Sequence, residues 1–159
     1  MTGLDQARFR EVLGHFATGI TIVTALEEGV PVGFSCQSFS ALSLDPPMVL
    51  LAPAKSSTSW PRIAAAGAFC VNILEAGQES VCRAFAVSGG DKFDGVEWTS
   101  GAATGAPVLT GSLAHIECTL GAIYEGGDHE LVTGLVVAIE EGEGSPLLFY
   151  RSGFGRFTP

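Results

Sequence analysis

A run of small polar residues at positions 33–40 is the first part of the sequence whose residue types suit ligand binding. It reads GFSCQSFS. Ser35, Gln37 and Ser40 offer hydroxyl and amide groups to the heteroatoms of a flat aromatic ring, while Cys36 and Phe39 can pack. An ordinary polar loop would have the same composition. A serine hydrolase elbow is disfavoured, because it requires the pattern G-x-S-x-G and Gln37 stands where the second glycine should be.

A second candidate, residues 55–59, reads KSSTS and directly precedes an expected helix that begins at Trp60. Free amides at a helix start, several hydroxyls and one ammonium group together suit a phosphate. A plain hydroxyl-rich helix cap is the competing interpretation. Because the chain has only eight Lys and Arg residues, the presence of Lys55 in this segment favours an anion site. It gives the phosphate site and the plain helix cap equal weight. No Walker-type glycine pattern accompanies the segment, so it indicates an anion without specifying ATP.

Three further short segments carry chemically useful side chains. Residues 127–130, Gly-Asp-His-Glu, place His129 at a turn, where an imidazole can titrate or donate a hydrogen bond near pH 7. Residues 150–153, Tyr-Arg-Ser-Gly, combine an aromatic ring with a guanidinium that could hold an aromatic or anionic ligand. Residues 91–93, Asp-Lys-Phe, lie in a glycine-rich stretch that could close over a ligand. A histidine alone in such a position, like His129, is more often just a turn residue, and the segment 91–93 is equally compatible with a solvated loop.

Composition excludes several classes of protein. The formal net charge is −9, and an acidic chain without a basic cluster is unsuited to nucleic acid. No apolar run reaches about 18 residues, and the polar start at residues 1–10 lacks a secretory core, so we expect no membrane span and a cytoplasmic location. The cysteines at 36, 70, 82 and 118 lack C-x-x-C spacing, and His15, His115 and His129 form no metal motif. Buried reduced thiols and no metal are expected.

Periodicity predicts mostly strands around these segments. A first helix should begin at the cap Asp5, bury an apolar stripe of Phe9, Val12, Leu13 and Phe16, and end near Gly19. Short helices are expected at residues 60–66 and 79–86, and a loop at 88–110. Strands are expected at 20–25, 32–34, 48–51, 69–74, 114–124, 130–140 and 146–151. With 159 residues and no β-α-β alternation, we expect a single mainly-β domain over residues 1–159, a barrel with peripheral helices.

Taken in order, six segments resemble the short-chain flavin reductase family, whose members supply reduced flavin to two-component monooxygenases. The segments are residues 9–21, 31–47, 55–60, 91–95, 127–129 and 146–151. The resemblance implies a split β-barrel that binds FMN or FAD, uses NADH or NADPH as electron donor, and forms a homodimer with the flavin site near the interface.

The same resemblance assigns roles to the candidate residues. Ser35, Cys36, Gln37 and Ser38, with Ser40 beside them, would line the flavin ring. Lys55, Ser56, Ser57 and Thr58 would hold the flavin phosphate, and Lys92 with Phe93 would cover the flavin. His129, Tyr150, Arg151 and Gly153 would border the nicotinamide. His129 is the expected catalytic residue, which positions the nicotinamide or stabilises charge on the reduced flavin.

The function that follows is an NAD(P)H:flavin oxidoreductase that supplies reduced flavin to a partner monooxygenase. The main alternative is a flavin-binding split barrel without NAD(P)H-dependent activity. A flavin-linked oxidase that uses another electron donor is a second alternative. A purely structural barrel is a third, although it would leave the anion site at residues 55–59 and the turn at His129 without a purpose.

Overall fold

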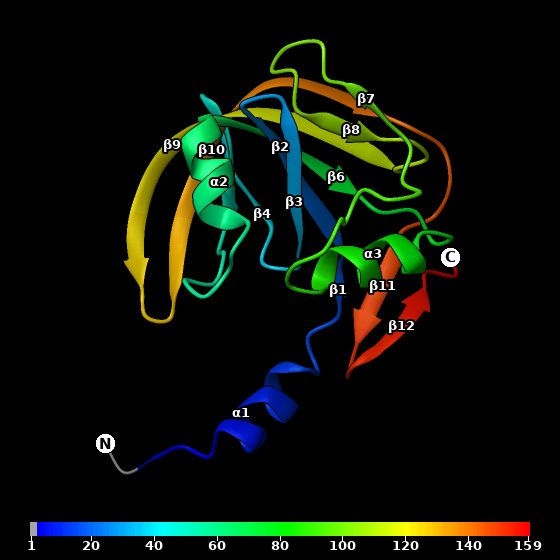
Figure 1. Ribbon diagram of the computed structural model, residues 1–159. Helices are drawn as coiled ribbons and strands as arrows, with labels where there is room; N and C mark the ends of the chain where they lie inside the picture. The colour runs from blue at the N-terminus through cyan, green and yellow to red at the C-terminus, as the bar shows by residue number, and fades with distance from the viewer. Residues whose placement is uncertain (1–2) are drawn as a thin grey trace.

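Strands dominate the computed structural model, which describes residues 3–159. Three short helices accompany twelve strands, so the expected mainly-β class with peripheral helices is confirmed (Figure 1). The helices are α1 (Gln6–Leu13), α2 (Trp60–Ala66) and α3 (Glu79–Ala86). The strands are β1 (Thr18–Gly19), β2 (Thr21–Glu27), β3 (Val30–Cys36), β4 (Ser40–Leu44), β5 (Pro47–Leu51), β6 (Ala68–Ile73), β7 (Trp98–Ser100), β8 (Pro107–Leu109), β9 (Ala114–Gly126), β10 (His129–Glu141), β11 (Leu147–Tyr150) and β12 (Gly153–Arg156).

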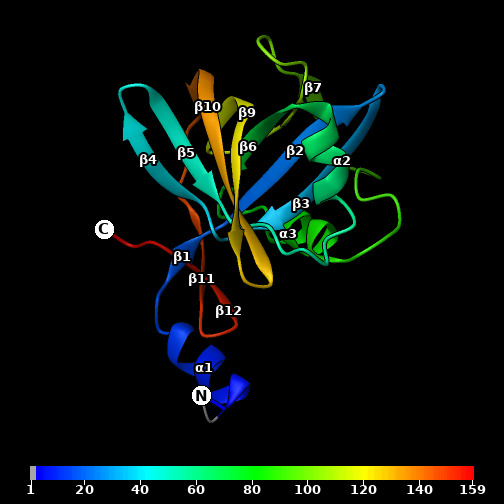
Figure 2. The ribbon, with the colours of Figure 1, turned by 90° about the vertical axis from the view of Figure 1, so that its left-hand side faces the viewer.

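Seven of the strands form one curved antiparallel sheet in the order β3-β2-β6-β9-β10-β5-β4 (Figures 1 and 2). Strand β2 lies inside this sheet and is buried on both faces. Successive side chains of a strand point to opposite faces, so odd-numbered and even-numbered residues of β2 pack in two different hydrophobic clusters. Val23 and Ala25 pack in a cluster with Trp60 and Ile63 of α2. Ile20, just before β2, and Ile22 pack in another cluster with Phe85 of α3. The two helices thereby cover the sheet near the ends of β3, where the polar segment 35–40 begins.

Helix α1 begins as expected and ends earlier than expected. The Asp5 carboxylate accepts a hydrogen bond from the Ala7 amide at 2.9 Å, which confirms the cap. The helix ends at Gly14, and the prediction that Gly19 stops it was wrong. Gly19 belongs instead to β1, which pairs with β11. Residues 18–19 form a strand because they pair with a strand far away in the sequence. A helix stop signal is local, so it cannot predict this pairing.

The apolar stripe of α1 is not buried in this chain. Phe9, Val12 and Leu13 are about half exposed, and Phe16 is 79% exposed. Figures 1 and 2 show the helix extending away from the sheet. The expected packing of this stripe against the core of its own chain was therefore wrong, and the helix has an apolar face that a single chain does not cover.

The strand predictions hold for the long elements and miss short ones. Strands β9 and β10 form the expected hairpin, with His129 paired opposite Gly126. Strands β1, β4, β7, β8 and β12 were missed. Within the expected loop 88–110, β7 and β8 pair as a small hairpin. Strand β12 pairs with β11 through a turn in which Arg151 and Ser152 have positive φ angles of 48° and 67°. The two central residues are neither glycine nor asparagine, the residue types that usually adopt positive φ in such a turn.

Two further features concern membrane-spanning helices and the state of the cysteines. None of the helices found between residues 3 and 159 is long and apolar enough to cross a membrane. All four cysteines are free and buried, as expected of reduced structural thiols.

Candidate functional site

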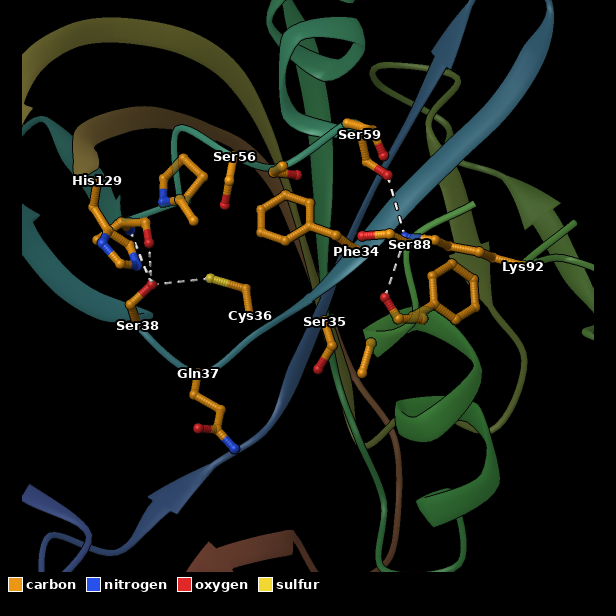
Figure 3. A pocket seen from close by; sticks show the side chains of 17 residues that line it. Phe34, Ser35, Cys36, Gln37, Ser38, Ser56, Ser59, Ser88, Lys92 and His129 are labelled. Atoms are coloured by element: carbon orange, nitrogen blue, oxygen red, sulfur yellow. Dashed lines mark hydrogen bonds between the residues drawn. The ribbon is translucent and has the colours of Figure 1, made fainter. Parts of the chain in front are cut away.

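A pocket of about 400 Å³ lies where β3 ends, beside the segment 52–59 and the start of β10. In Figure 3, His129 lies at one end of this pocket, and Ser59, Ser88 and Lys92 lie at the other. We call it the flavin pocket below, because the resemblance implies that residues 35–38 and 56–58 bind a flavin. Its lining comprises Phe34, Ser35, Cys36, Gln37, Ser38, Ala52, Pro53, Ala54, Ser56, Ser57, Thr58, Ser59, Phe85, Ala86, Ser88, Lys92 and His129.

Hydrogen bonds fix the wall that follows β3. The Ser38 hydroxyl donates to the Ala52 carbonyl at 2.9 Å and accepts from the Ala52 amide at 3.1 Å. Its oxygen also lies 3.2 Å from the Cys36 sulfur. Burial raises the pKa of the Cys36 thiol, so it stays neutral near pH 7 and is unsuited to act as a nucleophile. The Gln37 side chain makes no hydrogen bond to residues 3–159, which leaves its amide available to a ligand.

The opposite wall, residues 56–59, carries unused backbone donors. The Ser57 hydroxyl accepts from the Trp60 amide at 3.1 Å. Across the described chain, the amides of Ser56, Thr58 and Ser59 have no hydrogen-bond acceptor. Backbone amides are obligatory donors. Three free ones among hydroxyl side chains therefore make this wall a suitable place for an oxyanion.

Lys55, by contrast, does not line the pocket. Its ammonium lies 2.5 Å from the Glu125 carboxylate on β9. Lys92 supplies the cation instead. Its Nζ donates to the Gly33 carbonyl at 3.2 Å, and to the Ser59 hydroxyl and the Phe85 carbonyl, each at 3.3 Å. Burial lowers the pKa of Lys92.

Phe93 does not face the flavin pocket. Its ring meets the ring of Phe85 edge-on, with centroids 4.9 Å apart, and it packs in the cluster around α3. Lys92 and Phe93 thus lie in the structure as an anchored cation and a packing ring.

His129 is placed by backbone pairing between β10 and the segment before α2. The Lys55 amide donates to the Asp128 carbonyl, and the Glu130 amide donates to the Pro53 carbonyl, both at 3.0 Å. The Nδ1 atom of His129 lies 2.7 Å from the Asp128 carboxylate. That hydrogen bond, together with the imidazole charge, lowers the pKa of Asp128. With Nδ1 engaged, Nε2 is the ring nitrogen available to a ligand.

A larger pocket of about 860 Å³ adjoins the first, because Gln37 and His129 line both. We call it the donor pocket, because the resemblance implies that His129 and Arg151 border the nicotinamide. Its other walls come from α1 and the β11–β12 turn, and they include two arginines, Arg10 and Arg151. Neither arginine forms an ion pair within residues 3–159. The Asp128 carboxylate also lines this pocket and interacts electrostatically with Arg10, so the lining carries two guanidinium groups and one carboxylate.

The structure brings together most of the residues singled out from the sequence. Ser35, Cys36, Gln37, Ser38, Ser56, Ser57, Thr58, Lys92 and His129 line the flavin pocket, and Arg151 lines the donor pocket. Five others lie outside both linings. Ser40 bonds to the Ala41 carbonyl, and the Tyr150 ring meets His15 edge-on. The remaining three are Lys55, Phe93 and Gly153.

Sequence reasoning gave no role to three residues that the structure adds, and it included Ser59 only as part of the segment 55–59. Phe34 and Ser88 line the flavin pocket, and Arg10 lines the donor pocket. Arg10 belongs to the motif that begins at Phe9. Because the chain has only eight Lys and Arg residues, an arginine in that motif was a signal that could have identified it. Ser88 had no signal, because it lies in a glycine-rich stretch expected to be loop.

The chain matches a known family over most of its length. Residues 13–158 match the model of the flavin reductase like domain. The chain belongs to the flavin reductase family. The match runs from the last residue of α1 to β12 and past it. It includes the whole lining of the flavin pocket, whereas Gln6, Phe9 and Arg10 of the donor pocket precede it.

Individual members of this family are similar over nearly the whole chain. The reductase subunit HsaB of a flavin-dependent monooxygenase from Rhodococcus jostii is 51% identical, covering 98% of this chain and 80% of that protein. The FMN reductase (NADH) SmoA from Agrobacterium fabrum is 39% identical, covering 98% and 88%.

A solved structure of the family shows the same fold. The NADH:FAD oxidoreductase of Streptomyces globisporus, in complex with NAD and FAD fragments, superposes with a TM-score of 0.92 at 40% identity. It covers 98% of this chain and 94% of that one. The fold expected from the resemblance is therefore confirmed.

Proposed function

We propose that this chain is an NAD(P)H:flavin oxidoreductase that reduces FMN or FAD by hydride transfer and supplies the reduced flavin to a partner monooxygenase. The family and the activities named for its members support this function. One observation in the chain itself carries it: two pockets meet at Gln37 and His129. One pocket offers unused amides and hydroxyls, and the other offers two unpaired arginines. Two anionic ligands can therefore meet at one wall.

The flavin pocket fits a flavin in size and in chemistry. Its volume of about 400 Å³ lies within the roughly 300–1,000 Å³ typical of small-molecule sites. In our proposal the ring lies against residues 35–38, where Gln37 has a free amide. The phosphate accepts from the amides of Ser56 and Thr58 and from the neighbouring hydroxyls, with Lys92 as the nearest cation. Lys55 plays at most an indirect role, because Glu125 neutralises it.

The donor pocket takes the nicotinamide nucleotide in this proposal. Arg10 and Arg151 would bind its phosphates, since guanidinium groups form strong charge-assisted bonds with phosphate oxygens. When both ligands are bound, the nicotinamide supplies a hydride and the flavin accepts it. The protein's part is to hold the two rings against each other and exclude other geometries. His129 stands at the shared wall with Nε2 free, so we assign it to positioning the nicotinamide or stabilising charge on the reduced flavin.

We also propose that the active form is a homodimer. The apolar face of α1 is uncovered, and so is a second strip on β10. This strip consists of Leu135, Val137 and Ile139, which are 39%, 46% and 68% exposed. Soluble monomers rarely expose large contiguous apolar surfaces. A second copy of the chain would cover both faces, and because α1 lines the donor pocket, the interface would lie near the flavin site.

The remaining assignments follow from the same proposal. Residues 1–159 act as a single flavin reductase-like domain, and the protein works in the cytoplasm, where reduced nicotinamide nucleotides are available to it. The monooxygenase that receives the reduced flavin binds as a separate protein. No residue in the proposed chemistry needs to form a covalent bond with either ligand.

The deciding experiment mixes the purified protein with NADH or NADPH and either FMN or FAD, and follows the nicotinamide absorbance. Rapid oxidation that requires added or bound flavin is the expected result. A tightly bound yellow protein that neither nucleotide reduces would instead favour the flavin-binding barrel without reductase activity. Reduction by another electron donor alone would favour the oxidase.

A further inference from the structure

A third pocket, of about 530 Å³, continues from the phosphate end of the flavin pocket. The two share Thr58, Ser59 and Lys92, so they adjoin at that end. In Figure 3, Ser59 and Lys92 lie together at the end opposite His129. We call this space the outer pocket. Residues 30–33 of β3, Arg62 of α2 and the segment 89–93 form its walls.

The boundary between the two pockets carries a positive charge that no carboxylate neutralises. Lys92 donates to three oxygens there, those of Gly33, Ser59 and Phe85, and all three are neutral. Its ammonium forms no ion pair among the residues that the structure describes. A phosphate chain that passes from the flavin pocket into the outer pocket would run beside this ammonium.

A second cation stands further along the same path. The Nε atom of Arg62 donates to the Glu27 carboxylate at 2.5 Å. This ion pair uses only one edge of the guanidinium group. The two Nη atoms donate to no acceptor between residues 3 and 159, and the side chain is 43% exposed. Arg62 is thus fixed in place by Glu27 and still has donors for a phosphate.

The rest of the outer pocket suits a nucleoside. Val30, which is 54% exposed, and Pro31 give an apolar surface on one side. On the other side, Gly89 and Gly90 have positive φ angles of 79° and 72°, and a Cβ placed at either one would meet no atom within 4 Å. Their backbone is therefore open to a ligand. A flat base can lie between an apolar strip and an unobstructed backbone segment.

We propose that this chain takes FAD in preference to FMN, with the second phosphate on Arg62 and the adenosine in the outer pocket. This inference rests on the proposed function, because it extends the same flavin. FMN has one phosphate, which would end near Thr58 and Lys92 and leave Arg62 and the outer pocket unused. FAD has both the second phosphate and the nucleoside that these walls can bind.

The test compares dissociation constants of FAD, FMN and riboflavin, measured by quenching of flavin fluorescence at constant ionic strength. The wild-type protein should bind FAD about tenfold or more tightly than FMN, which corresponds to about 1.4 kcal/mol. Arg62→Gln should weaken FAD about five- to tenfold and leave FMN unchanged. FMN should in turn bind more tightly than riboflavin, because its phosphate reaches the free amides at residues 56–59.

Glu27→Gln is the matched control, because it breaks the same ion pair and keeps the cation. It should retain the preference for FAD. Thermal unfolding of both variants, followed by circular dichroism, shows whether either change disturbs the fold. Equal binding of FAD and FMN by the wild-type protein would overturn the inference, as would equal weakening of both flavins in Arg62→Gln. Absence of binding by all three flavins would instead reject the proposed function itself and the inference with it.

Discussion

The Nδ1 atom of His129 lies 2.7 Å from the carboxylate of Asp128, its neighbour in the chain. Asp128 belongs to the turn that joins β9 and β10, and His129 is the first residue of β10. The hydrogen bond between neighbours fixes which ring nitrogen is engaged and which is left for a ligand. The backbone also holds this turn in place. Strands β9 and β10 pair along their length, Ala54 forms a β-bridge with His129, and Gly127 adopts the positive φ of 77° in the turn.

Replacement of His129 by alanine should slow hydride transfer and leave flavin bound. We expect the rate of NADH oxidation at saturating flavin to fall roughly 10- to 100-fold, because the ring that positions the nicotinamide is gone. The flavin dissociation constant should change less than threefold, since the phosphate contacts at residues 56–59 remain. Asp128→Asn, which keeps the ring and removes its charged partner, should give a smaller loss. Unchanged oxidation of NADH by His129→Ala would refute the role assigned to this residue.

Replacement of Arg10 or Arg151 by glutamine should impair the nucleotide and spare the flavin. Loss of one charge-assisted contact to phosphate should raise KM for NADH about tenfold, with flavin affinity unchanged. Steady-state kinetics at fixed saturating flavin measure the effect. Arg8→Gln is the control on the same helix, because Arg8 pairs with Glu11 and does not line the donor pocket. If Arg8→Gln raised KM equally, the effect would belong to helix α1 as a whole.

Gly33→Ala should destabilise the protein and weaken flavin binding together. An added Cβ would lie 2.8 Å from the Phe85 ring and 2.9 Å from the Val23 carbonyl. Crowding of this kind in a packed core costs about 1–3 kcal/mol. Phe85 lines the flavin pocket and the Gly33 carbonyl holds Lys92, so the displacement reaches the ligand. Urea unfolding and fluorescence quenching measure the two effects. Gly155→Ala, which would meet no atom within 4 Å, should change neither.

Glu117 should stabilise the protein above about pH 4.5 and lose that effect in acid. Burial opposes the ionised carboxylate, but hydrogen bonds from the Thr104 hydroxyl and amide and from the Ala103 amide outweigh it, so the pKa of Glu117 is lowered from 4.5. Because the pKa of Glu117 is lower in the folded state than in the unfolded chain, its ionised carboxylate stabilises the fold at pH values above the unfolded-state pKa. That stabilisation is lost as the pH falls through the folded-state pKa.

The corresponding variant is Glu117→Gln, which loses the charge-assisted hydrogen bonds to residues 103–104. It should be about 2 kcal/mol less stable than the wild type at pH 7. Thermal unfolding from pH 7 to pH 3 should show the two proteins converging in acid. A difference in stability that stayed constant over that range would contradict the explanation.

Val137→Asp should separate the proposed homodimer into folded monomers. A carboxylate in the middle of the apolar strip on β10 would have to lose its water at an interface, at a cost of several kcal/mol. Sedimentation velocity at micromolar concentration measures the mass, and circular dichroism reports the fold. Val87→Asp, at an apolar position that is 62% exposed outside this strip, should leave the mass unchanged. A wild-type protein that sediments as a monomer would refute the dimer.

The sequence predicted the long elements well because their patterns are local. The strands at β9 and β10, the helix α3 and the cap at Asp5 follow from periodicity and from one side-chain oxygen. The short strands β1 and β12 depend on pairing with β11, and no residue in them signals that partner. The surroundings of Lys55 and Lys92 illustrate the same limit. Both are lysines in polar loops, and only the fold places Glu125 beside one and three neutral oxygens beside the other.

The wall that Gln37 and His129 form between the two pockets also affects the order in which the flavin and the nucleotide bind and dissociate. The flavin pocket and the donor pocket are formed by different segments and share only these two residues. Neither ligand would therefore have to leave before the other could enter. Initial-rate plots at several fixed flavin concentrations should intersect, as for a ternary complex, and parallel lines are not expected. Reduced flavin could then depart toward the oxygenase while the oxidised nucleotide is still bound.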